Sequence, residues 1–432
     1  MLRYGGNKLI VEKVKAQNVV LLLLLFLLFQ LCFSLVLSDL YVFEKASLEA
    51  DLVYTFHHVR FFIVSIVVLF SLILTLVIRT KGFLYIILVL ILIFFVFPSA
   101  ILFANIQNLD YRIFLSHELF FLVVLAFGKI KIKIASKTID IYSSRKLLLY
   151  ITLVGIVPFI ILYLPHINFK NFFFKEIYET RALMTAKVNN LYTNYTYSWF
   201  NKIIIPALFI YGFYLKKRST VLFSAILLIF LFLCGAHKTV FVGLFMVVVL
   251  YKFDYRRKSN YLIKFILLTA LGSLALSLIF DNNLAMVMTI RRAIFLPALL
   301  DVLYFDLFDG NHLYWSEVFN GLIIEYPYKH PHAFIVGEVY FKNIIWGANN
   351  GIISDGFMNF GMIGVIINIL IMGLYFSILN QLNISGKFFG IIFLFVFSLI
   401  SSSLTTVLLT HGGIILLILA FFILKDTRKQ ML

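Results

Sequence analysis

Residues 83–104 read FLYIILVLILIFFVFPSAILFA, an apolar run without a charged residue. A helix needs about 20 such residues to cross the roughly 30 Å hydrocarbon core of a bilayer, so this run predicts a membrane span. The whole chain agrees with it, since 62% of its 432 residues are hydrophobic and 13% are charged. This composition excludes a soluble enzyme, a disordered scaffold and a disulfide-stapled module.

Eleven further apolar windows extend this prediction to a polytopic, all-α membrane protein with about twelve transmembrane helices in one membrane domain, residues 1–432. The sixth, eighth and twelfth windows are short for a complete crossing. The windows are residues 19–38, 61–78, 83–104, 113–128, 147–164, 203–215, 220–236, 239–251, 261–280, 360–380, 388–404 and 412–424.

The placement of Lys and Arg predicts that the N- and C-termini both lie in the cytoplasm. With the N-terminus inside, most of the 37 Lys and Arg residues fall in cytoplasmic connections, and most of the 20 Asp and Glu residues fall on the other side. This asymmetry follows the positive-inside rule. The net charge of +17 therefore indicates orientation and attraction to anionic membrane lipids, and we expect no nucleic-acid partner.

Two connections on the side opposite the cytoplasm are long, residues 165–202 and residues 281–359. Long loops between packed spans usually carry function, so we expect the active site in the larger one. Its apolar patches at 295–308 and 334–346 predict short helices that lie on the membrane surface or dip into it.

The chain resembles a known family in two tracts of this region. Arg291-Arg292 followed by LPALLDVLYFDLF, and GANNGIISDGFMNFGMIGVIINILIMGL from Gly347 to Leu374, are similar to bacterial O-antigen polymerases of the Wzy type, also called oligosaccharide repeat unit polymerases. About a dozen spans, an inside N-terminus and two enlarged periplasmic loops are also features of that family. The resemblance implies a GT-C-like fold in the bacterial inner membrane.

The resemblance also implies an activity. The chain would be a metal-independent glycosyltransferase without a cofactor that polymerises undecaprenyl-pyrophosphate-linked oligosaccharide repeat units into O-antigen or capsular-type polysaccharide at the periplasmic face. Undecaprenyl pyrophosphate would be released at each step, and a chain-length regulator is a candidate partner.

This reaction needs cations for the pyrophosphate leaving group, because guanidinium groups can clamp it bidentately in place of a metal ion. The outward-facing candidates are Arg181, Arg291 and Arg292, of which the last two directly follow the ninth predicted span. An Arg pair at a helix end can equally reach lipid phosphate. Lys238, in the CGAHKT turn, is a fourth candidate, with solubility of a short turn as the alternative explanation.

The acceptor hydroxyl needs a base, for which the candidates are His312, His332, Glu338 and Asp355. Among the carboxylates Asp355 is favoured, because SDGFMNFG leads directly into the tenth predicted span, whose rigid end could position it. It could equally be the N-cap of that helix.

Asn349 and Asn350 could bind sugar hydroxyls, although Asn-Asn-Gly is first of all a turn signal. The nearby Gly361 and Gly364 favour close helix packing.

Two other functions stay open. A translocator (flippase) of lipid-linked oligosaccharide or polysaccharide would need a charged, hydrated cavity between the spans. The predicted spans contain few ionisable residues, mainly His117, Glu118 and Lys264. An O-antigen ligase would use similar chemistry, and no residue of the chain distinguishes it from a polymerase.

Overall fold

A computed structural model describes residues 2–77, 82–131, 134, 139–173, 175–188, 190–235, 244–245, 247–248, 251, 253–319 and 321–425. Within these ranges the chain is helical, and its β-type pairing is limited to the isolated bridges Tyr54–Ile106 and Ile384–Lys425. The predicted all-α class is therefore confirmed for the described part of the chain.

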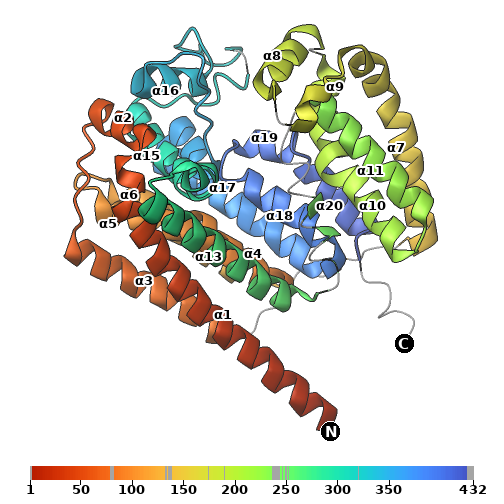
Figure 1. The fold of residues 1–432 in the computed structure, drawn as a ribbon, viewed down its shortest axis with the longest axis horizontal. Coiled ribbons are helices and arrows are strands. Elements are labelled where there is room, and N and C mark those ends of the chain that lie inside the picture. Colours follow the sequence, from red (N-terminus) through yellow and green to blue (C-terminus); the bar gives the residue numbers. More distant parts are fainter. Residues whose placement is uncertain are drawn as a thin grey trace. The chain divides into compact units, whose positions relative to one another are not determined.

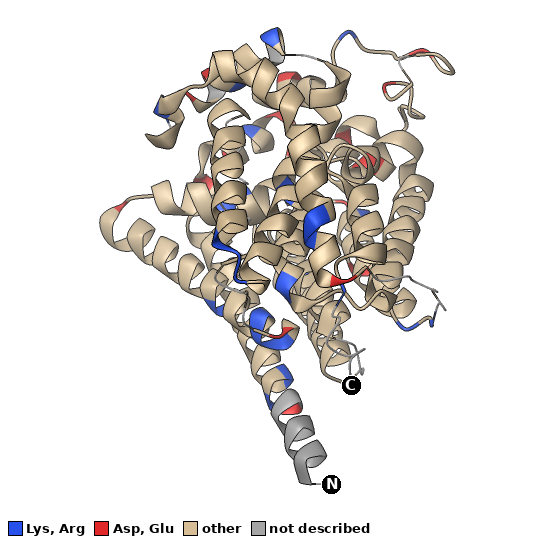
Figure 2. Cartoon of the chain, turned by 90° about the vertical axis from the view of Figure 1, so that its right-hand side faces the viewer, with Lys and Arg blue, Asp and Glu red and all other residues tan. Residues whose placement is uncertain are grey.

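Eight of the described helical stretches are long and apolar enough to cross a membrane, which makes the chain a multi-pass membrane protein by length and composition. They are Glu12–Asp39, His58–Val77, Gly82–Asn105, Ile141–His166, Arg218–Gly235, Tyr255–Phe280, Ile352–Gln381 and Leu404–Phe422. Long stretches of these helices carry no charged residue (Figure 2).

The other four predicted spans are not in this set. Windows 113–128, 203–215 and 388–404 coincide with shorter helices, Tyr111–Phe127, Ile205–Tyr214 and Phe389–Ser398. Most of window 239–251 lies outside the described residues. A count of twelve therefore stays a prediction.

The chain packs as two compact units, and the first consists of residues 1–131, 254–378 and 399–404. Its centre is the helix formed by α4, η2 and α5. In the apolar window of this helix 94% of the residues are buried, compared with 28% in that of α3. In Figure 1, α1 and α13 run side by side in this unit. Its elements are α1 (Leu2–Leu35), η1 (Leu37–Asp39), α2 (Tyr41–Glu49), α3 (His58–Val77), α4 (Gly82–Ile91), η2 (Leu92–Val96), α5 (Phe97–Asn105), α6 (Tyr111–Phe127), α13 (Tyr255–Phe280), α14 (Leu284–Met286), η6 (Val287–Phe295), α15 (Leu296–Phe308), α16 (His332–Phe341) and most of α17 (Ile352–Gln381).

The second unit consists of residues 132–253, 379–398 and 405–432. Aromatic rings around Phe159, including Tyr163, Tyr197 and Phe200, join α7 to α9 and η5. Its elements are α7 (Ile141–Tyr163), η3 (Leu164–His166), η4 (Phe169–Phe173), α8 (Ile177–Lys187), α9 (Leu191–Trp199), η5 (Phe200–Ile204), α10 (Ile205–Tyr214), α11 (Arg218–Gly235), η7 (Gly386–Phe388), α18 (Phe389–Ser398), most of α19 (Leu404–Leu408) and α20 (Gly413–Phe422).

Three π-helical turns interrupt these helices, and each ends shortly before a proline. Segments η2, η5 and η6 precede Pro98, Pro206 and Pro297, respectively. Proline cannot donate the regular backbone hydrogen bond and its ring clashes with the preceding turn, so a locally widened turn accommodates it. Such turns are frequent at functional sites, and both Lys202 and Arg291 lie on them.

Helix α15 differs from the surface helix expected at 295–308. Most of its residues are buried in the first unit, Asp301 included. The apolar side chains on all sides of this helix require burial on all sides. Asp301 is accommodated there because α6 provides it with a partner, His117.

Helix α17 is a hairpin of two helical segments, 352–359 and 362–381. The turn between them has non-helical backbone angles at Phe360 and at Gly361, which adopts φ 59° and ψ −147°. Gly356 lies so close to Gly364 that a Cβ on Gly356 would be 2.6 Å from the Gly364 backbone. Asn368 donates a 2.9 Å hydrogen bond to the carbonyl of Ile352. In a straight helix these two residues would be about 24 Å apart, so the short segment folds back along the long one.

Candidate functional site

Asp355 lies at the centre of a buried polar cluster in the first unit. Its side chain is 4% exposed, and its carboxylate accepts four N–H groups, from Asn350 (3.4 Å), Asn359 (3.1 Å), Asn368 (3.2 Å) and the backbone of Leu404 (3.0 Å). These donors come from both segments of α17, from the loop before it and from the start of α19. The carboxylate therefore holds four parts of the chain together, which suits an ionised form.

The same contacts exclude the alternative that Asp355 is an N-cap. Helix α17 begins at Ile352, so Asp355 belongs to its first turn, and its backbone N–H donates to Gly351. The hairpin turns the carboxylate toward Asn368 and Leu404.

His332 connects this cluster to Glu317. Its Nδ1 lies 2.6 Å from Glu317 Oε2, and its Nε2 lies 3.3 Å from Asn350 Oδ1. The Asn350 amide must present its oxygen to His332, because its nitrogen donates to Asp355. His332 Nε2 is therefore a donor, and its Nδ1 shares the second proton with Glu317. This produces a continuous hydrogen-bonded chain, Glu317–His332–Asn350–Asp355.

Glu317 is ionised in this arrangement. Burial by itself would raise the pKa of Glu317, but the hydrogen bond and the charge of His332 outweigh it, and the pKa is lowered. With 30% of its side chain exposed, Glu317 can be reached from solvent.

A second branch joins α6 to the cluster. His117 Nε2 lies 3.1 Å from Asp301 Oδ2, while its Nδ1 donates to the carbonyl of Ile113. Ser354, next to Asp355, donates to the other oxygen of Asp301. The sequence analysis noted His117 as an ionisable residue inside a predicted span, but no spacing in the chain indicates that it pairs with Asp301.

His312 lies beside the hairpin turn. Its ring packs edge-on against Phe357, and its Nε2 would be 2.8 Å from a Cβ on Gly361. Its Nδ1 is buried without a hydrogen-bond partner. His312 is thus close to the cluster but is not bonded to it in the described structure.

Two other predicted residues point away from the cluster. Glu338 and Asn349 are both exposed, on α16 and in the loop before α17, and no hydrogen bond in the described structure joins either side chain to Asp355. Of the Asn-Asn pair, Asn350 alone is buried in the cluster.

The predicted cations are distributed over both units. Arg291 and Arg292 lie on η6 in the first unit, where Arg291 is half-buried with an unbonded Nε and Arg292 is exposed. Burial, followed by the charge of Arg292, lowers the pKa of Arg291. Arg181 lies on α8 in the second unit. Lys238 lies outside the described residues.

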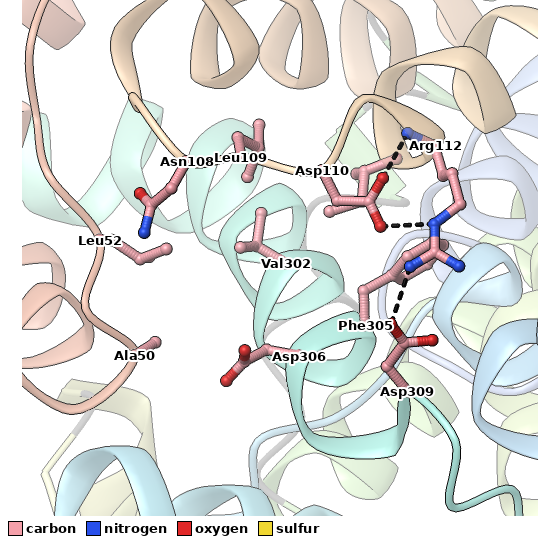
Figure 3. A pocket seen from close by; sticks show the side chains of 11 residues that line it. Ala50, Leu52, Asn108, Leu109, Asp110, Arg112, Val302, Phe305, Asp306 and Asp309 are labelled. Atoms are coloured by element: carbon pink, nitrogen blue, oxygen red, sulfur yellow. Dashed lines mark hydrogen bonds and ion pairs between the residues drawn. The ribbon is translucent and has the colours of Figure 1, made fainter.

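A pocket of about 260 Å³ opens in the first unit between the start of α6 and α15 (Figure 3). On one side Arg112 bridges Asp110 (2.6 Å) and Asp309 (2.9 Å). Asp306, which accepts a 2.5 Å hydrogen bond from Tyr340, and Asn108 also line it. Further lining residues are Ala50, Leu52, Leu109, Ile113, Val302 and Phe305.

The pocket and the cluster are built on the same elements. Asp306 and Asp301 belong to α15, and Arg112 and His117 belong to α6. Phe305 of the pocket stacks on Phe357 of the hairpin, with ring centroids 3.7 Å apart. Carboxylate, amide and guanidinium groups beside an aromatic wall can bind a ligand rich in hydroxyl groups. Sequence reasoning did not select Arg112, Glu317 or the pocket carboxylates as site residues.

Within the described residues, no group of three or more His, Cys, Asp or Glu side chains is arranged to hold a metal ion. No protein-family model, curated protein or solved structure matches this chain.

Proposed function

We propose that the chain is an integral-membrane glycosyltransferase that joins undecaprenyl-pyrophosphate-linked oligosaccharide repeat units into a polysaccharide, at the periplasmic face of a bacterial inner membrane. The observation that carries this proposal is the hydrogen-bonded chain Glu317–His332–Asn350–Asp355, which runs from a part-exposed glutamate to a buried aspartate. It combines an accessible carboxylate, that of Glu317, with a rigid support. Glu317 lies in the segment before α17, and Asp355 lies within α17.

In this proposal Glu317 accepts the proton of the acceptor hydroxyl. His332 donates hydrogen bonds from both ring nitrogens, so its ring has no nitrogen left to accept a proton. The carboxylate of Glu317 is therefore the acceptor of this pair. The hydroxyl oxygen bonds to the anomeric carbon of the donor glycan, the bond from that carbon to pyrophosphate breaks, and undecaprenyl pyrophosphate leaves with the electron pair. Asp355 has a positioning role, because it fixes Asn350 and thereby His332.

Arg291 and Arg292 are proposed to bind the pyrophosphate. Arg291 has an unbonded buried Nε, and Arg292 is exposed beside it, so both guanidinium groups have donors free for phosphate oxygens. The pocket lined by Asn108, Arg112 and Asp306 is proposed to bind sugar hydroxyls of the acceptor. A volume of about 260 Å³ has room for a monosaccharide.

A translocator is the second candidate, and one specific observation favours it. The buried pair His117–Asp301 and the buried Asp355 place ionisable groups within helices beside a helical hairpin. Ionisable groups at broken helices are typical of transport sites in membranes.

The test is incubation of the purified protein, reconstituted in liposomes, with a defined undecaprenyl-pyrophosphate-linked repeat unit, followed by sizing of the products. A ladder of lengths that differ by one repeat supports the polymerase. Movement of the repeat unit across the bilayer without joining would support the translocator. Transfer of preformed polymer to a lipid A core acceptor, without a ladder, would support the ligase.

Variants of the site sharpen this test. Glu317→Gln should abolish the ladder, whereas Glu325→Gln, at an exposed position of the same segment, should leave it unchanged. The rate of the wild-type enzyme should be flat from about pH 5 to 8 if Glu317 takes the proton, because the pKa of Glu317 is lowered. A rate that falls as the pH drops below about 6.5 would instead assign the proton to a histidine.

A further inference from the structure

The pocket between the start of α6 and α15 has an excess of negative charge. Three carboxylates line it, those of Asp110, Asp306 and Asp309, and Arg112 is its one cation. Three negative charges and one positive charge leave a formal charge of −2 on the pocket walls. The ligand of this pocket must be compatible with that charge.

Arg112 is already engaged by two of the carboxylates. Its Nε donates to Asp110 at 2.6 Å, and one of its terminal nitrogens donates to Asp309 at 2.9 Å. The backbone N–H of Arg112 also donates to Asp110, at 2.8 Å. These contacts fix the guanidinium group on one wall of the pocket. Because its positive charge is shared by two carboxylates, it offers little attraction to an anionic ligand.

Asp306 is the carboxylate of the pocket that has no cationic partner. None of the ion pairs of the described residues includes it, and its one hydrogen bond there is accepted from the Tyr340 hydroxyl, at 2.5 Å. Asp306 is exposed. Figure 3 shows its side chain on the opposite side of the pocket from the Arg112 guanidinium group. A ligand in the pocket can therefore reach the Asp306 carboxylate.

The chemistry of Asp306 selects the charge of the ligand. An ionised carboxylate only accepts hydrogen bonds, so the ligand must donate, from hydroxyl groups or from an ammonium group. A ligand carboxylate would instead bring two like charges together.

A metal ion is a poor alternative to an ammonium group. Within the described residues no group of three or more acidic, His or Cys side chains is arranged to hold one, and two of the three pocket carboxylates are engaged by Arg112. An ammonium group needs one carboxylate, with which it forms a charge-assisted hydrogen bond.

We propose that this pocket selects an amino sugar, whose protonated amine pairs with Asp306, over a neutral sugar, and that it disfavours a uronic acid. The inference rests on the proposed function, because that function assigns the pocket to the acceptor sugar. Asp306 is then a specificity-determining residue, and the preferred repeat unit has a free amine on the sugar that accepts the growing chain.

The test measures binding without sugar transfer. Full-length protein in phosphatidylcholine nanodiscs is titrated with the methyl glycosides of glucosamine, glucose and glucuronic acid, and affinities are obtained by saturation-transfer nuclear magnetic resonance. The glucosamine glycoside should bind about two- to fivefold more tightly than the glucose glycoside, since solvent weakens an exposed ion pair. The glucuronic acid glycoside should bind the most weakly.

Two variants assign this preference to Asp306. Asp306→Asn removes the charge and keeps an oxygen that can accept from Tyr340, so it should bind the glucosamine and glucose glycosides equally. Asp281→Asn, at an exposed aspartate of the same unit that does not line the pocket, is the matched control and should keep the wild-type preference. If Asp306→Asn does not fold, the wild type is titrated at rising salt concentration, which should reduce the preference.

Each outcome decides the inference. Equal binding of the three glycosides, binding of none of them, or a preference that survives in Asp306→Asn or at high salt overturns it. The proposed function fails separately. A wild type that prefers the amino sugar but forms no ladder of products would retain this inference and overturn the polymerase, whereas a ladder formed without this preference would do the reverse.

Discussion

The Asp355 cluster of the first unit and the Lys202–His411 pair of the second unit differ in how many hydrogen-bond partners surround the charged group. Asp355 receives four N–H donors and belongs to a network in which each partner has a further hydrogen bond or a backbone role. Lys202 belongs to none of the ion pairs of the described residues, and its Nζ lies 3.2 Å from His411 Nδ1. A satisfied network makes a structure rigid, whereas a part-buried cation without an anionic partner lowers the stability of the fold. The first arrangement is suited to positioning the groups of the site, whereas the second leaves a part-buried lysine without an anion among the described residues of its unit.

The largest expected effect is that of Asp355→Ala. It would leave buried donors on Asn350, Asn368 and Leu404 without an acceptor. We expect a loss of about 3–5 kcal/mol in the free energy of unfolding, measured by thermal or denaturant unfolding in detergent. Glu325→Ala, at an exposed position, should change it little. An unchanged stability of Asp355→Ala would remove the cluster as the rigid element of this comparison.

Gly361→Ala tests the hairpin that supports Asp355. At φ 59° and ψ −147° only glycine is unstrained, and the added Cβ would meet His312 Nε2 at 2.8 Å. We expect a destabilisation of about 1–3 kcal/mol. Gly272→Ala is the matched control, because its Cβ meets nothing within 4 Å and alanine favours the helix. That control should be stabilised by about 0.5–1 kcal/mol. Equal effects of the two substitutions would contradict the hairpin turn.

The Glu317–His332 pair predicts a pH dependence of stability. Because the pKa of Glu317 is lowered in the folded protein, its contribution is complete above the ordinary value of 4.5. It is then lost as the pH falls through the lowered pKa. The wild type should therefore lose stability relative to Glu317→Gln as the pH is reduced from about 5 to 3. Parallel unfolding temperatures of the two proteins over this range would show that the pair is not ionised.

The smallest effect has the opposite sign. Lys202→Met should raise the unfolding temperature of the protein in neutral detergent without phosphate, because it replaces an unpaired cation by an apolar side chain. The expected gain is on the order of 1 kcal/mol. A loss of stability would instead show that the contact of Lys202 with His411 stabilises the fold.

The apolar windows that fall within the described residues predicted helices correctly, because a long run without charge has few alternatives to a buried or lipid-facing helix. Window 83–104 corresponds to the buried helix Gly82–Asn105. The hairpin of α17 was not predicted, since Gly361 and Gly364 were interpreted as packing glycines within one span. Gly364 does pack closely, against Gly356, but Gly361 forms the turn.

The candidate site residues also divide into those that the sequence indicated and one that only the structure revealed. His332, Asn350 and Asp355 were selected by residue type, and the fold brings them together. Glu317 was not selected, because a glutamate in a long polar loop has no local signal that it will pair with a histidine.

By itself the sequence determined that the chain is helical and that many of its helices are apolar enough for a membrane. These properties depend on residues close together in the chain. The tertiary structure alone decided that Asp355 meets Leu404, that His117 meets Asp301, and that Lys202 meets His411. Those partners are brought together by packing between distant helices, and a linear pattern contains no record of which helices become neighbours.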